Sequence, residues 1–181
     1  MTTLGHGSDL RLAPTVAGYL PAGAGSSGAR AAIDAAAAAG FPAIQLDATL
    51  AGIRPRELDR RARHDLLALL RRRSLVLAGW DLFIPRKHYT DPGHVDRAMT
   101  ATLAAIDLAA DTGRAPLSLT LPVDEMTPDA VTGLLAAADA RGVRLALHGE
   151  DRDAALTASL ATHDAEVLGV GVDPAAVLSQ G

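Results

Sequence analysis

Short apolar runs alternate along the chain with stretches in which apolar residues recur every three or four positions. The first pattern is typical of buried strands, and the second is typical of amphipathic helices. Their regular alternation predicts successive strand–helix units, and therefore a parallel sheet. Six runs have strand length, namely Arg11–Ala17, Ala43–Asp47, Leu75–Leu82, Leu117–Leu121, Val143–His148 and Val167–Asp173.

Several of these runs are apolar at consecutive positions, as in LVLA at 75–78. Because a strand covered on only one face shows alternation, this pattern predicts a parallel sheet that is covered on both faces. Asp91-Pro92 and Thr127-Pro128 are typical of helix starts. Glycines that close helices are expected at the opposite ends, at Gly40, Gly113 and Gly142.

Two stripes of apolar residues predict which helix faces point to the core. Residues at helical spacing make up each stripe, Leu58, Ala62, Leu66, Leu69 and Leu70 in one and Val95, Met99, Leu103, Ile106 and Ala110 in the other.

The chain has 181 residues and no break in composition. We expect a single domain over 1–181, in which residues 1–9 form a flexible N-terminal tail. A closed eight-unit barrel takes ~250 residues, so about six units indicate either an open sheet or an incomplete (β/α) barrel. An incomplete barrel has open strand edges, which a homo-oligomer would cover.

Charge and cysteine content exclude several classes of function. The net charge is −4 and there is no cysteine, which rules out disulfides and cysteine-ligated metals and fits a cytoplasmic protein. No stretch predicts a signal peptide or membrane span. Eight of the 17 basic residues lie between Arg54 and Arg73, interspersed with acidic residues and leucines. This pattern favours a solvated outer helix over a nucleic-acid site.

Polar residues follow the predicted strands, where parallel α/β folds bind their ligands. They are Asp47, Asp81, Asp124, Glu125, His148, Glu150, Asp151 and Asp173. Carboxylates and an imidazole at one rim suit a divalent cation or acid–base chemistry on a polyol. Turns and helix caps are an alternative reason for any single aspartate. The polar loop 84–91 is long enough to bring His88 over such a site.

GAGSSG at 23–28 matches the dinucleotide fingerprint, with Asp47 about 20 residues further on. The fingerprint needs its first glycine directly after the strand, whereas Leu20-Pro21-Ala22 intervenes here. A mobile loop of small residues is favoured, and nucleotide binding is kept as an alternative.

Four segments together resemble the xylose isomerase-like superfamily of TIM barrels, which includes sugar phosphate isomerases/epimerases. They occur in the right order and span most of residues 29–178. The segments are AAAAGFPAIQL at 36–46, LAGWD at 77–81, LALHGE at 145–150 and VGVDP at 170–174.

The resemblance implies a barrel that holds Mn, Mg, Co or Zn while side chains move a proton between neighbouring carbons of a sugar. It implies metal ligation by His148, Glu150 and Asp173. Some positions depart from the family pattern. The histidine expected three residues after Asp173 is Ala176, and the glutamate frequent in the second strand is Gln45.

The first hypothesis is therefore a sugar phosphate isomerase/epimerase-like protein with an incomplete set of metal ligands. Its catalytic candidates are His148, Glu150 and His88, and its substrate-binding candidates are Asp47, Asp81 and Trp80. The second hypothesis is a non-catalytic relative that binds a small carbohydrate or serves assembly. Neither hypothesis involves nucleic acid or a membrane.

Overall fold

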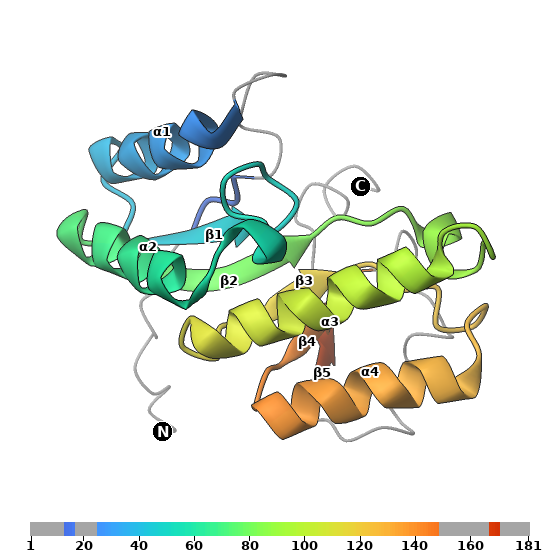
Figure 1. Cartoon of the computed structure of the whole chain (residues 1–181). Coiled ribbons are helices and arrows are strands. Elements are labelled where there is room, and N and C mark those ends of the chain that lie inside the picture. The colour runs from blue at the N-terminus through green and yellow to red at the C-terminus, as the bar shows by residue number, and fades with distance from the viewer. Residues whose placement is uncertain (1–12, 17–24, 149–166, 171–181) are drawn as a thin grey trace, which may run out of the picture.

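The computed structural model describes residues 13–16, 25–148 and 167–170, which centre on one parallel sheet (Figure 1). Its strands lie in chain order and are β1 (Ala43–Asp47), β2 (Val76–Leu82), β3 (Leu117–Leu119), β4 (Leu145–Leu147) and β5 (Leu168–Val170). Thr15 adds a parallel bridge to Gln45 beside β1. The predicted parallel (β/α) architecture is confirmed, as an incomplete barrel. Residues 1–12 lie outside the described part, so the N-terminal tail stays a prediction.

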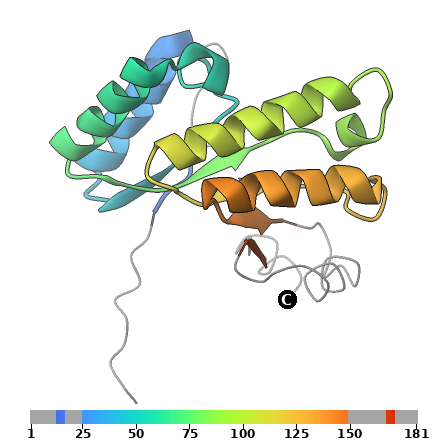
Figure 2. The same ribbon diagram turned by 60° about the horizontal axis from the view of Figure 1, so that its bottom comes forward.

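Four α-helices lie on the same side of this sheet (Figure 2). They are α1 (Gly25–Ala38), α2 (Arg60–Arg72), α3 (Val95–Asp111) and α4 (Pro128–Arg141), joined by the short 3₁₀ turns η1 (Pro55–Glu57) and η2 (Arg86–Tyr89). None of the helices within the described ranges is long and apolar enough to cross a membrane.

Burial alternates along the strands. Leu46, Leu117 and Leu145 are fully buried, whereas Gln45 and Ser118 on the opposite face are half-buried. Side chains of a strand point to the two faces in turn, so one face packs on the helices and the other carries the polar residues. The expectation of two apolar faces is wrong at the amino end of β2, where Val76 is 60% exposed.

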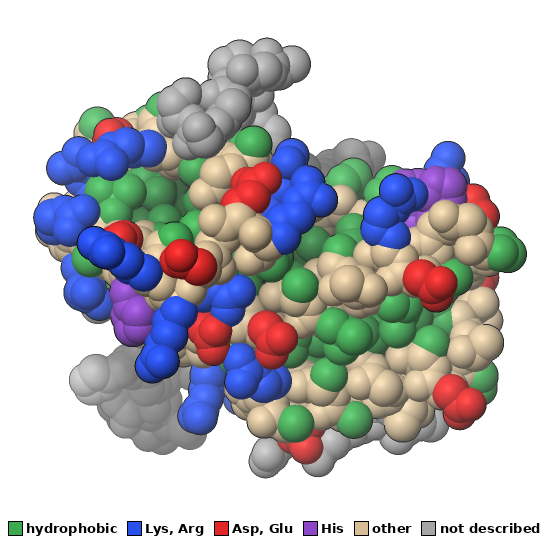
Figure 3. Space-filling model, in the orientation of Figure 1, with side chains coloured by type: hydrophobic (Ala, Val, Ile, Leu, Met, Phe, Trp, Pro, Cys, Tyr) green, Lys and Arg blue, Asp and Glu red, His purple; other side chains and the backbone are tan. Residues whose placement is uncertain are grey.

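Helix α2 follows its predicted pattern. Asp59 caps it by accepting a hydrogen bond from Ala62 N at 2.8 Å, and the leucine stripe is buried at Leu66, Leu69 and Leu70. Its remaining residues give the surface a mixture of basic and acidic side chains around α2 (Figure 3). The prediction of a solvated outer helix is confirmed.

Helix α3 differs from its predicted stripe. Its buried face contains Ala98, Ala105 and Ala109, while Leu103 is 41% exposed. Of the predicted stripe, Ile106 is fully buried, and Leu108 from outside the stripe is buried beside the alanines. Small side chains let a helix lie close to the sheet, so the inner face combines alanines with these two larger residues. The helix also begins later than Asp91 predicts.

The helix ends are otherwise as expected. Thr127 caps α4 by accepting from Ala130 N at 3.3 Å. Gly142 closes the same helix with φ 62°, a left-handed conformation that costs glycine little. Positive φ at Gly40 and Gly113 fits the same role after α1 and α3.

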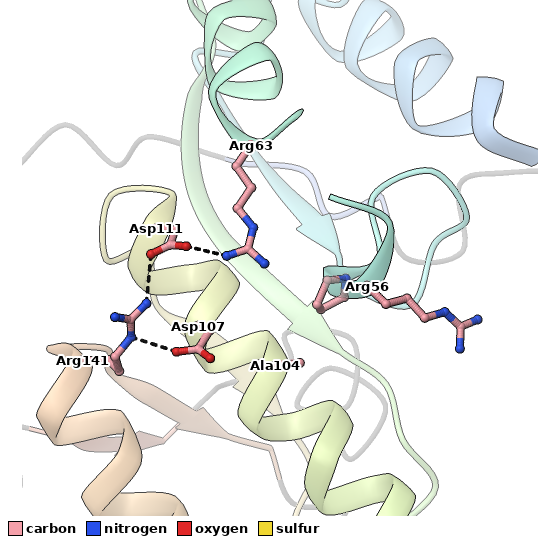
Figure 4. A pocket seen from close by; sticks show the side chains of 7 residues that line it. Arg56, Arg63, Ala104, Asp107, Asp111 and Arg141 are labelled. Carbon is pink, nitrogen blue, oxygen red and sulfur yellow. Dashed lines mark hydrogen bonds and ion pairs between the residues drawn. The ribbon is translucent and has the colours of Figure 1, made fainter. Parts of the chain in front are cut away.

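A cluster of ion pairs joins α2, α3 and α4 on the outer surface (Figure 4). Asp111 of α3 accepts from Arg63 of α2 and, at 2.9 Å, from Arg141 of α4. Arg141 also pairs with Asp107 at 2.9 Å. These residues line a groove of about 370 Å³. The ion pairs of Arg63, Asp107, Asp111 and Arg141 therefore link three helices along this groove.

We predict that Asp111→Asn destabilises the fold by about 1 kcal/mol, because one carboxylate serves two guanidinium groups from different helices. Urea unfolding followed by the fluorescence of Trp80, the single tryptophan, measures this. Asp65→Asn is the matched control. Asp65 is 76% exposed and lies as far as 4.0 Å from its partner Arg61, so its ion pair is weak. Equal effects of the two variants would contradict the prediction.

Candidate functional site

The polar face of the sheet carries a cluster of side chains near the carboxyl ends of the strands. Strand register places Asp81 level with Asp47 on one side and with Ser118 on the other. Gln45 lies two residues before Asp47 and thus on the same face. Polar residues from β1, β2 and β3 therefore converge, although they are far apart in sequence.

Asp81 is the centre of this cluster. Its Oδ1 accepts a hydrogen bond from Gln45 Nε2 at 2.5 Å, and its Oδ2 accepts one from Thr15 Oγ1. Gln45 Nε2 also donates to Ser118 Oγ at 3.1 Å. The hydrogen bonds thus connect segment 13–16 with β1, β2 and β3 through their side chains.

Glycine at position 79 allows the close approach of the neighbouring strand. Gly79 pairs with Gln45 across the strands. A Cβ at this position would lie 3.1 Å from the carbonyl oxygen of Pro116, closer than such contacts ordinarily are, and 3.6 Å from Gln45 Cδ, an ordinary van der Waals distance. The absence of a side chain at Gly79 therefore accommodates the backbone of Pro116, and the Gln45 side chain packs over the glycine.

The pKa of Asp81 is raised above its ordinary value. Burial is the largest cause, because it disfavours the ionised carboxylate. Hydrogen bonds from Thr15 and Gln45 oppose the rise, nearby Asp47 adds to it, and His148 lowers it. The net effect shifts Asp81 towards the neutral acid, a state that can donate a proton.

Asp47 has one oxygen committed to the local turn. Its Oδ1 accepts from Thr49 N at 2.7 Å and from Thr49 Oγ1 at 2.6 Å. Within the described ranges its Oδ2 has no hydrogen-bond partner. The turn explanation for this aspartate therefore accounts for its Oδ1.

His148 follows β4, and its backbone N–H donates to Leu119 O at 3.0 Å. Its side chain is half-buried and acts electrostatically on Asp81. Asp47, Asp81 and His148 are thus brought together as expected at one end of the sheet. Glu150 and Asp173 lie outside the described residues, so their places in the site stay predictions.

Trp80 is not at this site. It is fully buried, and its Nε1 donates to Thr112 Oγ1 at 2.8 Å, at the end of α3. Alternation along β2 turns its indole away from neighbouring Asp81 and into the helix-covered core. Its expected contact with substrate is replaced by this role in packing.

His88 lies in η2 and interacts with its own loop and α3. Its ring stacks on His94, with centroids 4.4 Å apart and planes 12° apart. Its pKa is lowered by desolvation and by the nearby positive charges of His94, Lys87 and Arg97, against the opposing effect of Asp91. Its interactions are therefore with residues other than the Asp81 cluster.

The remaining strand-end acids have other partners. Asp124 and Glu125 lie 3.6 Å and 3.7 Å from Arg86 Nη2, which ties loop 122–126 to η2. Asp151 is outside the described part of the chain. The site residues that sequence reasoning missed are Thr15, Gln45 and Ser118. A polar residue at an alternate position within an apolar strand, as in LSL at 117–119, is the signal that could have found Ser118.

The glycine motif differs from the expected loop. Residues 25–28 form the first turn of α1 rather than a loop, while Gly23 and Ala24 lie outside the described part. Nucleotide binding through Gly23–Gly28 stays an untested alternative.

Of the three expected metal ligands, His148 lies in the described part of the chain, and Glu150 and Asp173 lie outside it. Within residues 13–16, 25–148 and 167–170, no three histidine or acidic side chains are placed to hold a metal ion. The oxygens of Asp81 already accept hydrogen bonds from Gln45 and Thr15. Both oxygens of Asp81 are thus engaged in hydrogen bonds with other parts of the chain.

Comparison with solved structures reveals the same fold in known barrels. A xylose isomerase domain protein from Planctomyces limnophilus matches with a TM-score of 0.64 and 15% identity over 79% of this chain and 57% of its own. A xylose isomerase-like TIM barrel protein from Mycobacterium smegmatis, in complex with magnesium, matches with a TM-score of 0.64 and 16% identity over 92% and 65%.

A D-psicose 3-epimerase from Clostridium cellulolyticum, solved with D-tagatose, matches with a TM-score of 0.50 and 12% identity over 66% of this chain and 46% of its own. The chain thus spans about half to two-thirds of the length of these proteins. No protein-family profile matches the sequence, and no curated protein does. At these identities the likeness establishes the fold, and the chain has the fold of a xylose isomerase-like TIM barrel in incomplete form.

Proposed function

We propose that the carboxyl end of the sheet binds a small sugar or sugar phosphate and that the chain supports isomerase- or epimerase-type proton transfer on it. The observation that carries the proposal is the joining of Gln45, Asp81 and Ser118 across neighbouring strands, with Asp47 and His148 beside them. The fold supports the same function, because its solved relatives include an epimerase with a bound ketose.

The chemistry of the cluster suits a polyhydroxylated ligand. Sugar hydroxyls both donate and accept hydrogen bonds, and the cluster offers carboxylate, amide, hydroxyl and imidazole groups within one small area. A carboxyl whose pKa is raised by burial can exchange a proton closer to neutral pH. We assign proton transfer to Asp81 and His148, with Glu150 as a further candidate, and ligand binding to Asp47.

A divalent metal held by His148, Glu150 and Asp173 is part of the proposal. A related barrel was solved with magnesium, which supports the idea at the level of the fold. When bound, such an ion would polarise a sugar oxygen. Of these three residues, His148 lies in the described part of the chain, and Glu150 and Asp173 stay predicted ligands.

A non-catalytic carbohydrate-binding protein is the second candidate. It is favoured by the hydrogen bonds of Asp81, because both of its oxygens already accept bonds from the chain itself. A carboxyl engaged in this way can orient a binding surface without exchanging protons with a ligand. Catalysis and binding are separated by measuring turnover and affinity on the same preparation.

We predict that D-fructose or D-tagatose binds the wild-type chain and that Gln45→Ala weakens this binding at least about tenfold, because the amide positions both Asp81 and Ser118. Calorimetric titration measures the affinity, and conversion of the ketose tests for activity. Asp65→Asn controls for loss of a polar side chain elsewhere. If Gln45→Ala binds like wild type, the cluster is not the binding site.

Stability should depend on the ionisation of Asp81. Because its folded-state pKa is raised, the folded chain binds this proton more tightly than the unfolded chain does. Stability from this group therefore falls as pH rises from about 4, the ordinary carboxyl pKa, through the raised value. Asp81→Asn removes the dependence, so the variant should gain stability relative to wild type between pH 4 and about 7.

Urea unfolding across this pH range, followed by the fluorescence of buried Trp80, measures the difference. Asp65→Asn provides the baseline for removing one surface carboxylate. A constant difference between Asp81→Asn and wild type across the range would contradict a raised pKa.

For the metal, we predict that purified protein binds Mn²⁺, Mg²⁺, Co²⁺ or Zn²⁺ more tightly than a His148→Ala/Asp173→Ala variant does. Equilibrium dialysis with elemental analysis measures the bound ion, and circular dichroism confirms that the variant folds. Equal metal content in the two proteins would contradict this ligand set. The proposed sugar site has its own test and would stand after such a result.

A further inference from the structure

Phe83 is an unusually exposed aromatic residue beside the candidate site. Its side chain is 74% exposed, more than Val76 at 60% or Leu103 at 41%, the other exposed large hydrophobic residues within the described ranges. Trp80 and Tyr89, by contrast, are buried. Single exposed apolar residues are common on proteins, so the meaning of this one depends on its position.

Phe83 directly follows β2 at the end of the sheet where the polar cluster lies. The preceding residue, Leu82, pairs with Leu119 and is buried under the helices, at 5% exposure. Successive residues in extended chain point to opposite sides, so the ring of Phe83 belongs on the same side as Asp81. An aromatic surface and a hydrogen-bonding cluster thus occupy one face.

The backbone around Phe83 is held in place by contacts of the residues before and after it in the chain. Before it, β2 is fixed in the sheet. After it, Ile84 packs against the core and Arg86 pairs with Asp124 and Glu125. Tyr89 is then held by a buried hydrogen bond of 2.9 Å between its hydroxyl and that of Thr102. The backbone therefore keeps the ring out of the core.

We propose that Phe83 is a stacking platform for the C–H face of a cyclic sugar whose hydroxyls bond to the Asp81 cluster, an inference that rests on the proposed function. A sugar ring has polar edges and an apolar face, so a site that recognises it combines hydrogen-bonding groups with a flat aromatic surface. The aromatic ring would favour cyclic sugars over short open-chain polyols, which lack such a face.

Four proteins test this assignment by calorimetric titration with D-fructose and D-tagatose. They are wild type, Phe83→Ala, Phe83→Trp and Val76→Ala. Val76 is the matched control, because it is an exposed apolar residue at the first position of β2, the strand that Phe83 follows. Phe83→Ala should weaken binding about five- to tenfold, the effect expected for a lost aromatic contact.

Phe83→Trp should bind within about twofold of wild type, since it keeps a flat apolar ring, and Val76→Ala should be unchanged. Glycerol, an open-chain polyol, should show no difference between Phe83→Ala and wild type. Circular dichroism and Trp80 fluorescence establish that Phe83→Ala is folded.

Three results would overturn the platform. If Phe83→Ala binds both sugars like wild type while Gln45→Ala does not, the sugar site stands and the platform is wrong. If wild type binds neither sugar, the proposed function and the platform both fail. If Phe83→Ala leaves sugar affinity intact but converts a wild-type dimer to monomer in sedimentation, the ring contacts a second copy of the chain instead.

Discussion

The level register of the parallel strands is the constraint on which the candidate site depends. Side chains alternate between the two faces, so a slip of one residue between neighbouring strands would send a polar residue into the core. The pairing of β1 with β2 shifts between Ile44 and Gln45, where Ala78 has no partner of its own. Without this shift, Gln45 would pair with Ala78 rather than with Gly79. The irregularity thus places glycine opposite the long amide and brings Asp47 level with Asp81.

The same alternation explains why the site can be polar beside an apolar core. Trp80 and Asp81 are neighbours in sequence but serve opposite faces of the sheet. The buried indole needs a partner for its one polar atom, and Thr112 provides it while donating its own hydroxyl proton to Leu108 O at 2.7 Å. Because Trp80 is fixed on the helix side, the backbone holds Asp81 facing the other way. Packing of Trp80 on one face of the sheet thereby positions the Asp81 carboxyl on the other face.

Local patterns in the sequence were sufficient for most of the fold. The runs that became β1–β5 stand out by their apolar residues, and the leucine stripe of α2 and the Thr127 cap act over a few positions. Helix α3 shows the limit of this reasoning, because many apolar residues competed for its inner face. Its inner face combines alanines with Ile106 and Leu108 while Leu103 is exposed, so hydrophobicity alone does not decide which residues face the sheet.

The site was less predictable for a related reason. Aspartates after strands could be found from the order of the elements, but Thr15, Gln45 and Ser118 join Asp81 only through register between distant segments. Assigning Trp80 and Asp81 to the same site also overlooked that adjacent strand residues cannot share a face. Local pattern therefore indicated the correct end of the sheet, whereas the identity of the interacting side chains required the pairing of the strands.

The two hydrogen-bond donors to Asp81 differ in a way that bears on proton transfer. Gln45 Nε2 can only donate, so it favours an oxygen of Asp81 that remains an acceptor. The Thr15 hydroxyl can donate or accept, so it can turn its hydrogen away when Oδ2 takes up a proton. Protonation at Oδ2 therefore preserves both contacts, while protonation at Oδ1 would place two donors against each other. Of the two donors to Asp81, Thr15 is thus the one that can remain a hydrogen-bond partner of a protonated oxygen.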